Sequence, residues 1–152
     1  MLIYLFMNVG TFAVILSMRV KDRYVESIDD LSGISKTNPA IALALTVLMF
    51  SMAGIPPLAG FFGKYFVFAA AVNAGLIPLA VIGVLSSVVG AFYYLRLIKI
   101  MYFDESAETF DRPDFSTSLV MGVCAVAVVV FIFLPEPLLA GADAAAAALF
   151  QS

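Results

Sequence analysis

Two prolines and a lysine interrupt the apolar sequence of this chain in the phrase Ala53-Gly54-Ile55-Pro56-Pro57-Leu58-Ala59-Gly60-Phe61-Phe62-Gly63-Lys64. It lies inside an apolar run, residues 39–95, in which Lys64 carries the only formal charge. An ammonium is costly to place in a bilayer, so a lone lysine in such a run marks an ion or proton path. The alternative is a lysine whose long side chain lifts its ammonium to the membrane surface.

The composition is that of a membrane protein. Hydrophobic residues make up 63% and charged residues 12%, and the mean hydropathy is +1.07, whereas about a quarter of the residues of a soluble domain are charged. We therefore expect an all-α, polytopic membrane helix bundle.

Several classes of function are excluded by what the chain lacks. It has no histidine, which excludes a histidine-bound metal or haem and a histidine-based catalytic triad within the chain. One cysteine, Cys124, excludes an intrachain disulfide, and its apolar neighbours indicate a packing residue. A net charge of −3 offers no basic patch for nucleic acid.

A helix needs about 20 residues to span a bilayer. The chain has four apolar segments of about this length or longer, at about 1–18, 39–73, 76–102 and 115–135. They predict about four transmembrane segments in a single membrane domain over 1–152, with a C-terminal tail at 136–152. Segment 1–18 lacks a basic start and a small-residue cleavage site, so it reads as a span rather than a signal peptide.

Segment 39–73 is too long for one helix, because it would reach about 52 Å against about 30 Å of hydrocarbon. Pro56 and Pro57 predict the break, and Gly54 and Gly60 loosen the backbone on either side. Backbone groups freed by the break must be buried in protein or line a watery cavity, and transporters place ion sites at such discontinuous helices. A proline kink without a transport role is the alternative, and Lys64 favours the ion site.

Orientation follows from the lysines and arginines other than Lys64, which lie in linkers 19–38 and 96–114 and are absent from residues 73–78 and from the tail. The positive-inside rule places both linkers in the cytoplasm and both chain ends outside, so Lys64 falls in the outer half of its span. Side chains tilt toward the N-terminus of a helix, which directs Lys64 back to the break. A buried lysine can lose and regain a proton near neutral pH, and we therefore predict that Lys64 carries protons.

Other polar residues suggest weaker roles. Five are candidates for hydrogen-bonded water wires, with helix packing as the alternative: Asn8, Thr11, Ser51, Ser86 and Ser87. A second set predicts an aromatic belt with basic anchors at the cytoplasmic surface: Tyr93, Tyr94, Arg96, Lys99 and Tyr102. Linker 104–114, with five acids and one arginine, reads as a solvated loop or a partner contact, and residues 141–152 as a short outer helix.

Four phrases of the chain closely resemble subunit N of the proton-pumping NADH:quinone oxidoreductase, respiratory complex I. They are Tyr4-Leu5-Phe6-Met7-Asn8-Val9-Gly10-Thr11-Phe12, Asp30-Leu31-Ser32-Gly33-Ile34, Met52 onward through the proline, glycine and lysine phrase to Tyr65, and Tyr93-Tyr94-Leu95-Arg96-Leu97-Ile98-Lys99-Ile100-Met101-Tyr102. The resemblance covers essentially the whole chain. It implies the C-terminal third of an antiporter-like subunit, from the eleventh span to the fourteenth, which would explain a start inside a helix.

The resemblance implies that Lys64 is the lysine of the family's broken twelfth helix, holding a proton on the outlet side of a half-channel. It implies a proton-translocating subunit without redox chemistry of its own, with flavin and iron-sulfur clusters in partner subunits and no cofactor in this chain. The implied partners are other membrane subunits of complex I, the lipid bilayer and protons, in a prokaryotic cytoplasmic membrane. The family's glutamate and further lysines on earlier helices have no counterpart here, so the chain alone resembles an incomplete pump.

Two other readings remain open. Multi-subunit sodium/proton antiporters and membrane-bound hydrogenases share a similar proline, glycine and lysine phrase. A non-transporting membrane scaffold, with Lys64 as a packing or anchoring residue, is the second.

Overall fold

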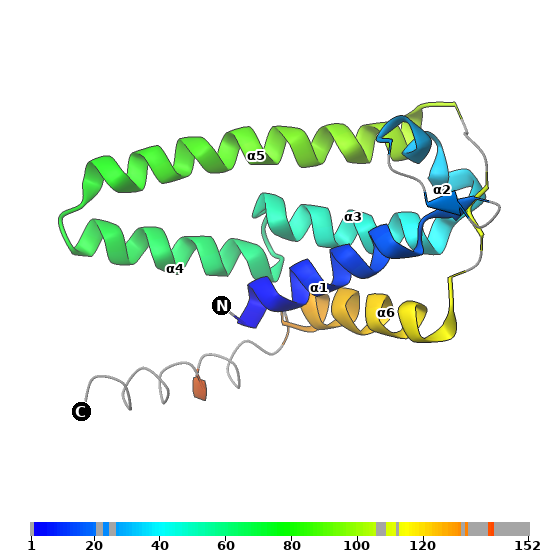
Figure 1. The fold of residues 1–152 in the computed structure, drawn as a ribbon. Coiled ribbons are helices and arrows are strands. Elements are labelled where there is room, and N and C mark those ends of the chain that lie inside the picture. The colour runs from blue at the N-terminus through cyan, green and yellow to red at the C-terminus, as the bar shows by residue number, and fades with distance from the viewer. Residues whose placement is uncertain are drawn as a thin grey trace.

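The computed structural model describes residues 2–20, 23–24, 27–105, 109–111, 113–131, 133 and 140–141. Its helices are α1 (Leu2–Ser17), α2 (Ile34–Thr37), α3 (Pro39–Ala53), α4 (Ala59–Asn73), α5 (Ile77–Phe103) and α6 (Phe115–Val130), with a 3-10 turn η1 (Asp29–Leu31) (Figure 1). Two short strands, β1 (Arg19–Val20) and β2 (Arg23–Tyr24), pair antiparallel with Arg19 opposite Tyr24. The fold is mostly helical, as the composition predicts.

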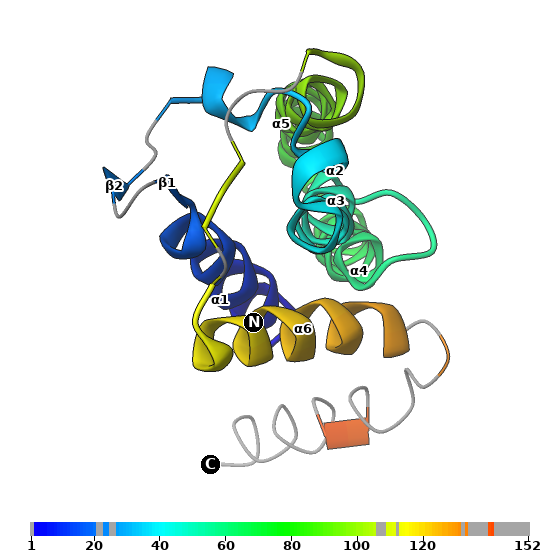
Figure 2. The same ribbon diagram turned by 90° about the vertical axis from the view of Figure 1, so that its right-hand side faces the viewer.

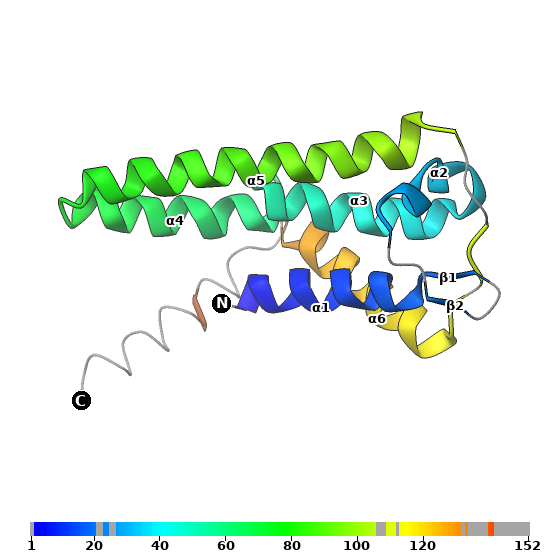
Figure 3. The same ribbon diagram turned by 45° about the horizontal axis from the view of Figure 1, so that its top comes forward.

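The helices are arranged around one long hairpin. Helices α3 and α4 lie end to end along α5, which returns antiparallel to them after the turn at residues 74–76 (Figure 1). Helices α1 and α6 pack against each other and against α3, on one side of this row, as the end view shows (Figure 2). The far halves of α4 and α5 extend beyond α1 and α6 (Figure 3).

The prolines explain where the helices begin. Pro39 stands at the start of α3 and Pro78 at the start of α5, positions where an amide has no helical partner to lose. Among the described residues, one helix is long and apolar enough to cross a membrane, Ile77–Phe103, and three apolar helices are shorter: Ile3–Ser17, Pro39–Ala53 and Phe115–Val130. The predicted count of four spans therefore stays a prediction.

The core joins α1, α3, α5 and α6. Met7, Val14, Leu45, Leu48 and Met101 are all buried to 2% exposure or less. Most of α5 is exposed and apolar, since only 6% of its most hydrophobic window is buried. Such a surface suits lipid or another apolar helix better than water.

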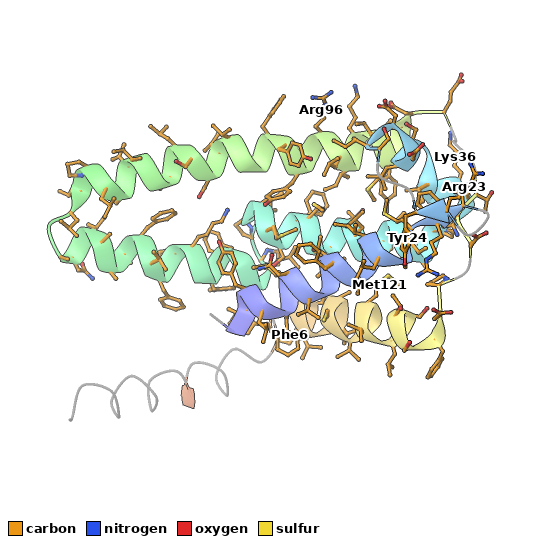
Figure 4. The ribbon with its side chains drawn as sticks, viewed as in Figure 1. Phe6, Arg23, Tyr24, Lys36, Arg96 and Met121 are labelled. Atoms are coloured by element: carbon orange, nitrogen blue, oxygen red, sulfur yellow. The ribbon has the colours of Figure 1, made fainter. Side chains whose placement is uncertain are left out.

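Arg23 and Lys36 lie between α1 and α3 in the chain, whereas Arg96 belongs to α5. Arg23, Tyr24 and Lys36 lie together at the end of the bundle where α2 sits, and Arg96 points away from the bundle (Figure 4).

Linker 104–114 has exposed acids at Glu105, Asp111 and Asp114, as expected of a solvated loop, but it is anchored to the bundle at Phe110. Phe110 is only 4% exposed and belongs to the core. The side-chain amide of Asn38 donates to the Phe110 carbonyl at 3.2 Å, and the Phe110 amide donates back to Asn38 Oδ1 at 3.1 Å. The Asp111 amide also donates to the Arg19 carbonyl at 2.7 Å. One aromatic ring and these backbone bonds hold the linker to the bundle, despite its acids.

Helices α1, α5 and α6 fall on the predicted apolar segments, and residues 39–73 form two helices, α3 and α4, with the predicted break between them. The predicted end of the fourth segment at residue 135 lies outside the described residues. So does the predicted outer helix of residues 141–152, apart from Gly141.

Candidate functional site

The first half of the broken helix ends in a well-formed cap. Gly54 adopts the left-handed conformation, with φ of 82°, which favours glycine because it has no Cβ. The Gly54 amide donates to the Ser51 carbonyl at 3.0 Å and the Ile55 amide to the Phe50 carbonyl at 3.1 Å, the two bonds of a Schellman motif. This cap leaves the carbonyl of Ala53, the last residue of α3, pointing out of the helix without a helical donor.

The second half begins against the first through one buried serine. Ser51 is 0% exposed, and its hydroxyl accepts the amide of Gly60 at 3.0 Å, satisfying a first-turn donor of α4. The same hydroxyl donates to Met7 Sδ at 3.0 Å, which ties α1 to the break. Ser51 was a candidate for a water wire, and here its hydroxyl instead joins three helices.

Gly60 is required for this close approach. A Cβ built on Gly60 would lie 1.8 Å from the Ser51 carbonyl oxygen, far inside van der Waals contact. The glycine on the far side of the prolines therefore lets the two half-helices overlap side by side at the break.

Lys64 turns back to the break. Its Nζ donates to the Ala53 carbonyl at 3.0 Å, so the ammonium meets the carbonyl end of α3, where the helix dipole is negative. A Cβ on Gly54 would lie 2.9 Å from Lys64 Cδ and 3.3 Å from Nζ, so the missing side chain of Gly54 makes room for the lysine. Lys64 is half-buried, and the direction of its side chain is the one that helix geometry predicts.

An open cavity of about 740 Å³ lies beside Lys64, between α4 and α5. We call it the Lys64 groove; its walls include Ala53, Gly54, Phe61, Lys64, Tyr65, Phe68, Asn73, Val84, Ser87, Val88 and Ala91. Most of these side chains are apolar, and among the described residues Lys64 is the one charged group on the groove. Every aspartate and glutamate of the chain lies in a linker or after residue 135, outside the apolar segments.

The other candidate residues lie in different surroundings in the structure. Ser87 lies on the Lys64 groove, near the lysine. Asn8 and Ser86 are exposed and donate to carbonyls of their own helices, those of Tyr4 and Ile82. Thr11 is 8% exposed, and its hydroxyl has no hydrogen-bond partner within the described part of the chain.

The sequence analysis missed Thr46 and the carbonyl of Ala53. Thr46 is 8% exposed, and its hydroxyl donates to the Ala42 carbonyl at 2.7 Å and lies 3.4 Å from the hydroxyl of Tyr102. The sequence did contain a signal for the Ala53 carbonyl, because a helix that ends at a glycine leaves its last carbonyls without helical donors. Lys64 is the nearest charged donor in sequence to that helix end.

Comparison with known proteins identifies relatives of this chain. The family model described as "NADH:quinone oxidoreductase/Mrp antiporter, TM" matches residues 1–90. The chain is 59% identical over 151 residues to NADH-quinone oxidoreductase subunit N of Paramagnetospirillum magneticum, covering 99% of this chain and 31% of that protein. It is 63% identical over 148 residues to the subunit N of Rhodospirillum rubrum, covering 97% of this chain and 30% of the relative.

A solved structure shares the fold. The chain superposes on a chain of respiratory complex I from Thermus thermophilus with bound aureothin, with a TM-score of 0.73 and 31% identity. The match covers 88% of this chain and 32% of that one. The chain thus spans about a third of the length of the proteins it matches.

Proposed function

This chain belongs to the NADH:quinone oxidoreductase/Mrp antiporter family of membrane proteins, and from that membership we propose that it acts as part of a proton-translocating, antiporter-like subunit of a respiratory NADH:quinone oxidoreductase. Lys64 is the residue that takes up and releases the proton, on the outlet side of a half-channel. The redox chemistry, with its flavin and iron-sulfur clusters, belongs to partner subunits, and this chain contributes to the translocase through the membrane part alone.

One observation carries the proposal. The Lys64 ammonium donates to the Ala53 carbonyl at the broken end of α3, beside the Lys64 groove. A lysine among apolar side chains, held by a helix end instead of a carboxylate, has a place to bind a proton and a groove toward which to release it. The helix break supplies the carbonyl that an unbroken helix would use internally.

The arrangement of the helices supports a proposal for how the chain crosses the membrane. Helices α3 and α4 run end to end along α5, whose 27 residues amount to about 40 Å of helix. We propose that α3 and α4 together make one discontinuous span, giving four membrane segments with α1, α5 and α6. The membrane is the cytoplasmic membrane of a prokaryote, and other membrane subunits of the complex and lipid cover the exposed apolar faces.

Orientation has its own test. With the charged linkers in the cytoplasm and both chain ends outside, a thiol label introduced at Ile28, which is 41% exposed, should be reached only from the cytoplasmic side. A label at Ala144, outside the described residues, should be reached only from the opposite side. The reverse pattern would place Lys64 in the inner half of the membrane and contradict the outlet assignment.

The matched family also includes Mrp antiporters, so a sodium/proton antiporter subunit is the alternative within the family. Identities of 59% and 63% to proteins named subunit N favour the oxidoreductase. A scaffold without transport is the second alternative, in which Lys64 only caps the Ala53 carbonyl at the end of α3; loss of proton pumping in a Lys64 variant that assembles normally distinguishes the two.

The experiment replaces Lys64 by methionine in the full-length subunit within the assembled complex. Lys64→Met keeps much of the side-chain volume and removes the titrating amine, so we expect normal assembly with a large loss of NADH-driven proton pumping. Lys99→Met, the same change at an exposed lysine of α5, is the matched control and should pump normally. Normal pumping by Lys64→Met at wild-type amounts of complex would leave Lys64 as a structural residue.

A further inference from the structure

Ser51 differs from other helical hydroxyls of the chain in where its proton goes. Four of those described donate to a carbonyl three or four residues earlier in their own helix: Ser17 to Val14, Thr37 to Ile34, Thr46 to Ala42 and Ser86 to Ile82. The Ser51 hydroxyl instead donates at 3.0 Å to Met7 Sδ on α1, which is 44 positions away in sequence. A thioether sulfur is a weak acceptor, so this bond needs a compensating gain.

The gain lies in what the oxygen of Ser51 does. We propose that Met7 is a positioning residue for Lys64: its sulfur takes the proton of the Ser51 hydroxyl and so leaves the Ser51 oxygen directed at the amide of Gly60. This inference rests on the proposed role of Lys64 as a proton carrier.

The competing bond of Ser51 is to its own helix. A serine inside a helix can donate to carbonyls three or four residues earlier, which here are those of Leu48 and Val47. Reaching them would turn the hydroxyl back along α3, away from the start of α4. The Met7 sulfur accepts the proton without that turn, and Ser51 Oγ stays 3.0 Å from the Gly60 nitrogen.

A second contact between α1 and α3 holds Met7 opposite Ser51. Gly10 lies three residues after Met7, and a Cβ built on Gly10 would lie 3.0 Å from Leu48 Cδ1 and 2.7 Å from Cys124 Cβ. Leu48 lies three residues before Ser51, so the two pairs face each other across antiparallel helices (Figure 1). Met7 and Leu48 are both buried to 1% exposure or less. Close packing at Gly10 therefore sets the height of the sulfur along α3.

The Gly60 amide carries the effect of this contact to the lysine. Lys64 lies four residues after Gly60, one turn further along the same side of α4. Its Nζ reaches back to the carbonyl of Ala53, two residues after Ser51, at 3.0 Å. The bond from the Gly60 amide to Ser51 Oγ fixes the first turn of α4 against the end of α3. If Ser51 turned to its own helix, that turn of α4 would lose its anchor and Lys64 its fixed distance to the Ala53 carbonyl.

Met7 thus gives α1 a part in the site through an apolar side chain. The candidates that the sequence suggested on α1 were the polar residues Asn8 and Thr11, and neither has a printed bond to the break: Asn8 donates to the Tyr4 carbonyl, and the Thr11 hydroxyl has no partner within the described part of the chain. The contact with the break comes from the residue next to Asn8.

The test uses the full-length subunit within the assembled complex and measures the rate of NADH-driven proton pumping per assembled complex. Met7→Leu nearly conserves the volume of the side chain and removes the sulfur. We expect the rate to fall about two- to tenfold, because the net contribution of one hydrogen bond changes the ratio of the anchored to the unanchored break by about that factor. Met49→Leu is the matched control and should pump normally, since Met49 is buried on α3 at 6% exposure and makes no hydrogen bond to the described residues through its sulfur.

A double-mutant cycle separates positioning from packing. Ser51→Ala removes the hydroxyl and should lower the rate at least as much as Met7→Leu. Adding Met7→Leu to Ser51→Ala should then cause no further fall, because the two residues act through one bond, whereas independent packing effects would combine.

The outcomes also separate this inference from the role of Lys64. Loss of pumping in Lys64→Met with a normal rate in Met7→Leu would overturn the role of Met7 alone. Normal pumping in Lys64→Met would overturn the proposed function and this inference with it. Equal losses in Met7→Leu and Met49→Leu, a further fall when Met7→Leu is added to Ser51→Ala, or failure of Met7→Leu to assemble would each show a structural role and overturn the positioning.

Discussion

Replacing Gly60 by alanine should open the break in the helix. The added Cβ would lie 1.8 Å from the Ser51 carbonyl oxygen, so the two half-helices must separate by more than an ångström to reach ordinary contact. A backbone carbonyl cannot rotate away as a flexible side chain can, so overpacking here should cost about 1–3 kcal/mol. Separation also removes the buried bond from the Gly60 amide to Ser51 Oγ, worth about 1–3 kcal/mol more when the amide is left unpaired.

Together these effects predict a loss of about 2–6 kcal/mol from the stability of the subunit. The assay compares the amount of assembled complex on native gels and its temperature of inactivation, with the full-length subunit carrying Gly60→Ala. Gly63→Ala is the matched control, because a Cβ on Gly63 meets no atom within 4 Å and alanine favours the helix by about 0.5–1 kcal/mol. Equal amounts and equal inactivation temperatures for the two variants would refute the close packing at the break.

Three further predictions follow from the same contacts. Gly54→Ala places a side chain at φ of 82° and against Lys64, so it should cost about 1–2 kcal/mol and lower proton pumping more than assembly; unchanged pumping would contradict it. Ser51→Ala leaves the first-turn amide of α4 unpaired and should lower the inactivation temperature of the complex by an amount equivalent to about 1–3 kcal/mol, whereas Ser86→Ala, at an exposed serine, should not. Asn38→Ala removes both bonds to the Phe110 backbone and should speed protease cleavage within linker 104–114 in membrane vesicles; wild-type cleavage rates would contradict the anchoring.

Much of the backbone could be predicted from the sequence because proline and glycine act locally. Pro56 and Pro57 lack amide hydrogens, so a helix through them would lose its bonds, and α3 indeed ends at Ala53 and α4 begins at Ala59. The direction of Lys64 was equally local, because all side chains of an α-helix tilt toward its N-terminus.

The contacts across the break could not be predicted in the same way. Ser51 and Gly60 approach through a non-helical loop, and Ser51 meets Met7 across 44 positions of sequence, so helical periodicity says nothing about either pair. A serine in an apolar segment is equally suited to water and to a backbone amide, and only the packing decides.

Linker 104–114 shows the same limit. Its charge predicted exposed acids, and those described are exposed, but it did not predict the anchor in which Asn38 holds the Phe110 backbone across 72 positions. A single phenylalanine among acids was the one local sign that part of the linker would be buried.

The most direct test of the proton-carrier claim is the number of protons pumped per NADH oxidised by complex carrying Lys64→Arg, reconstituted in sealed vesicles. Arginine keeps the positive charge at the break but stays protonated, so it cannot release a proton. Exchange of a proton at Lys64 predicts that this ratio falls well below the wild-type value while the complex still assembles. A wild-type ratio would show that the site needs only a positive charge and would contradict the role of Lys64 as a proton carrier.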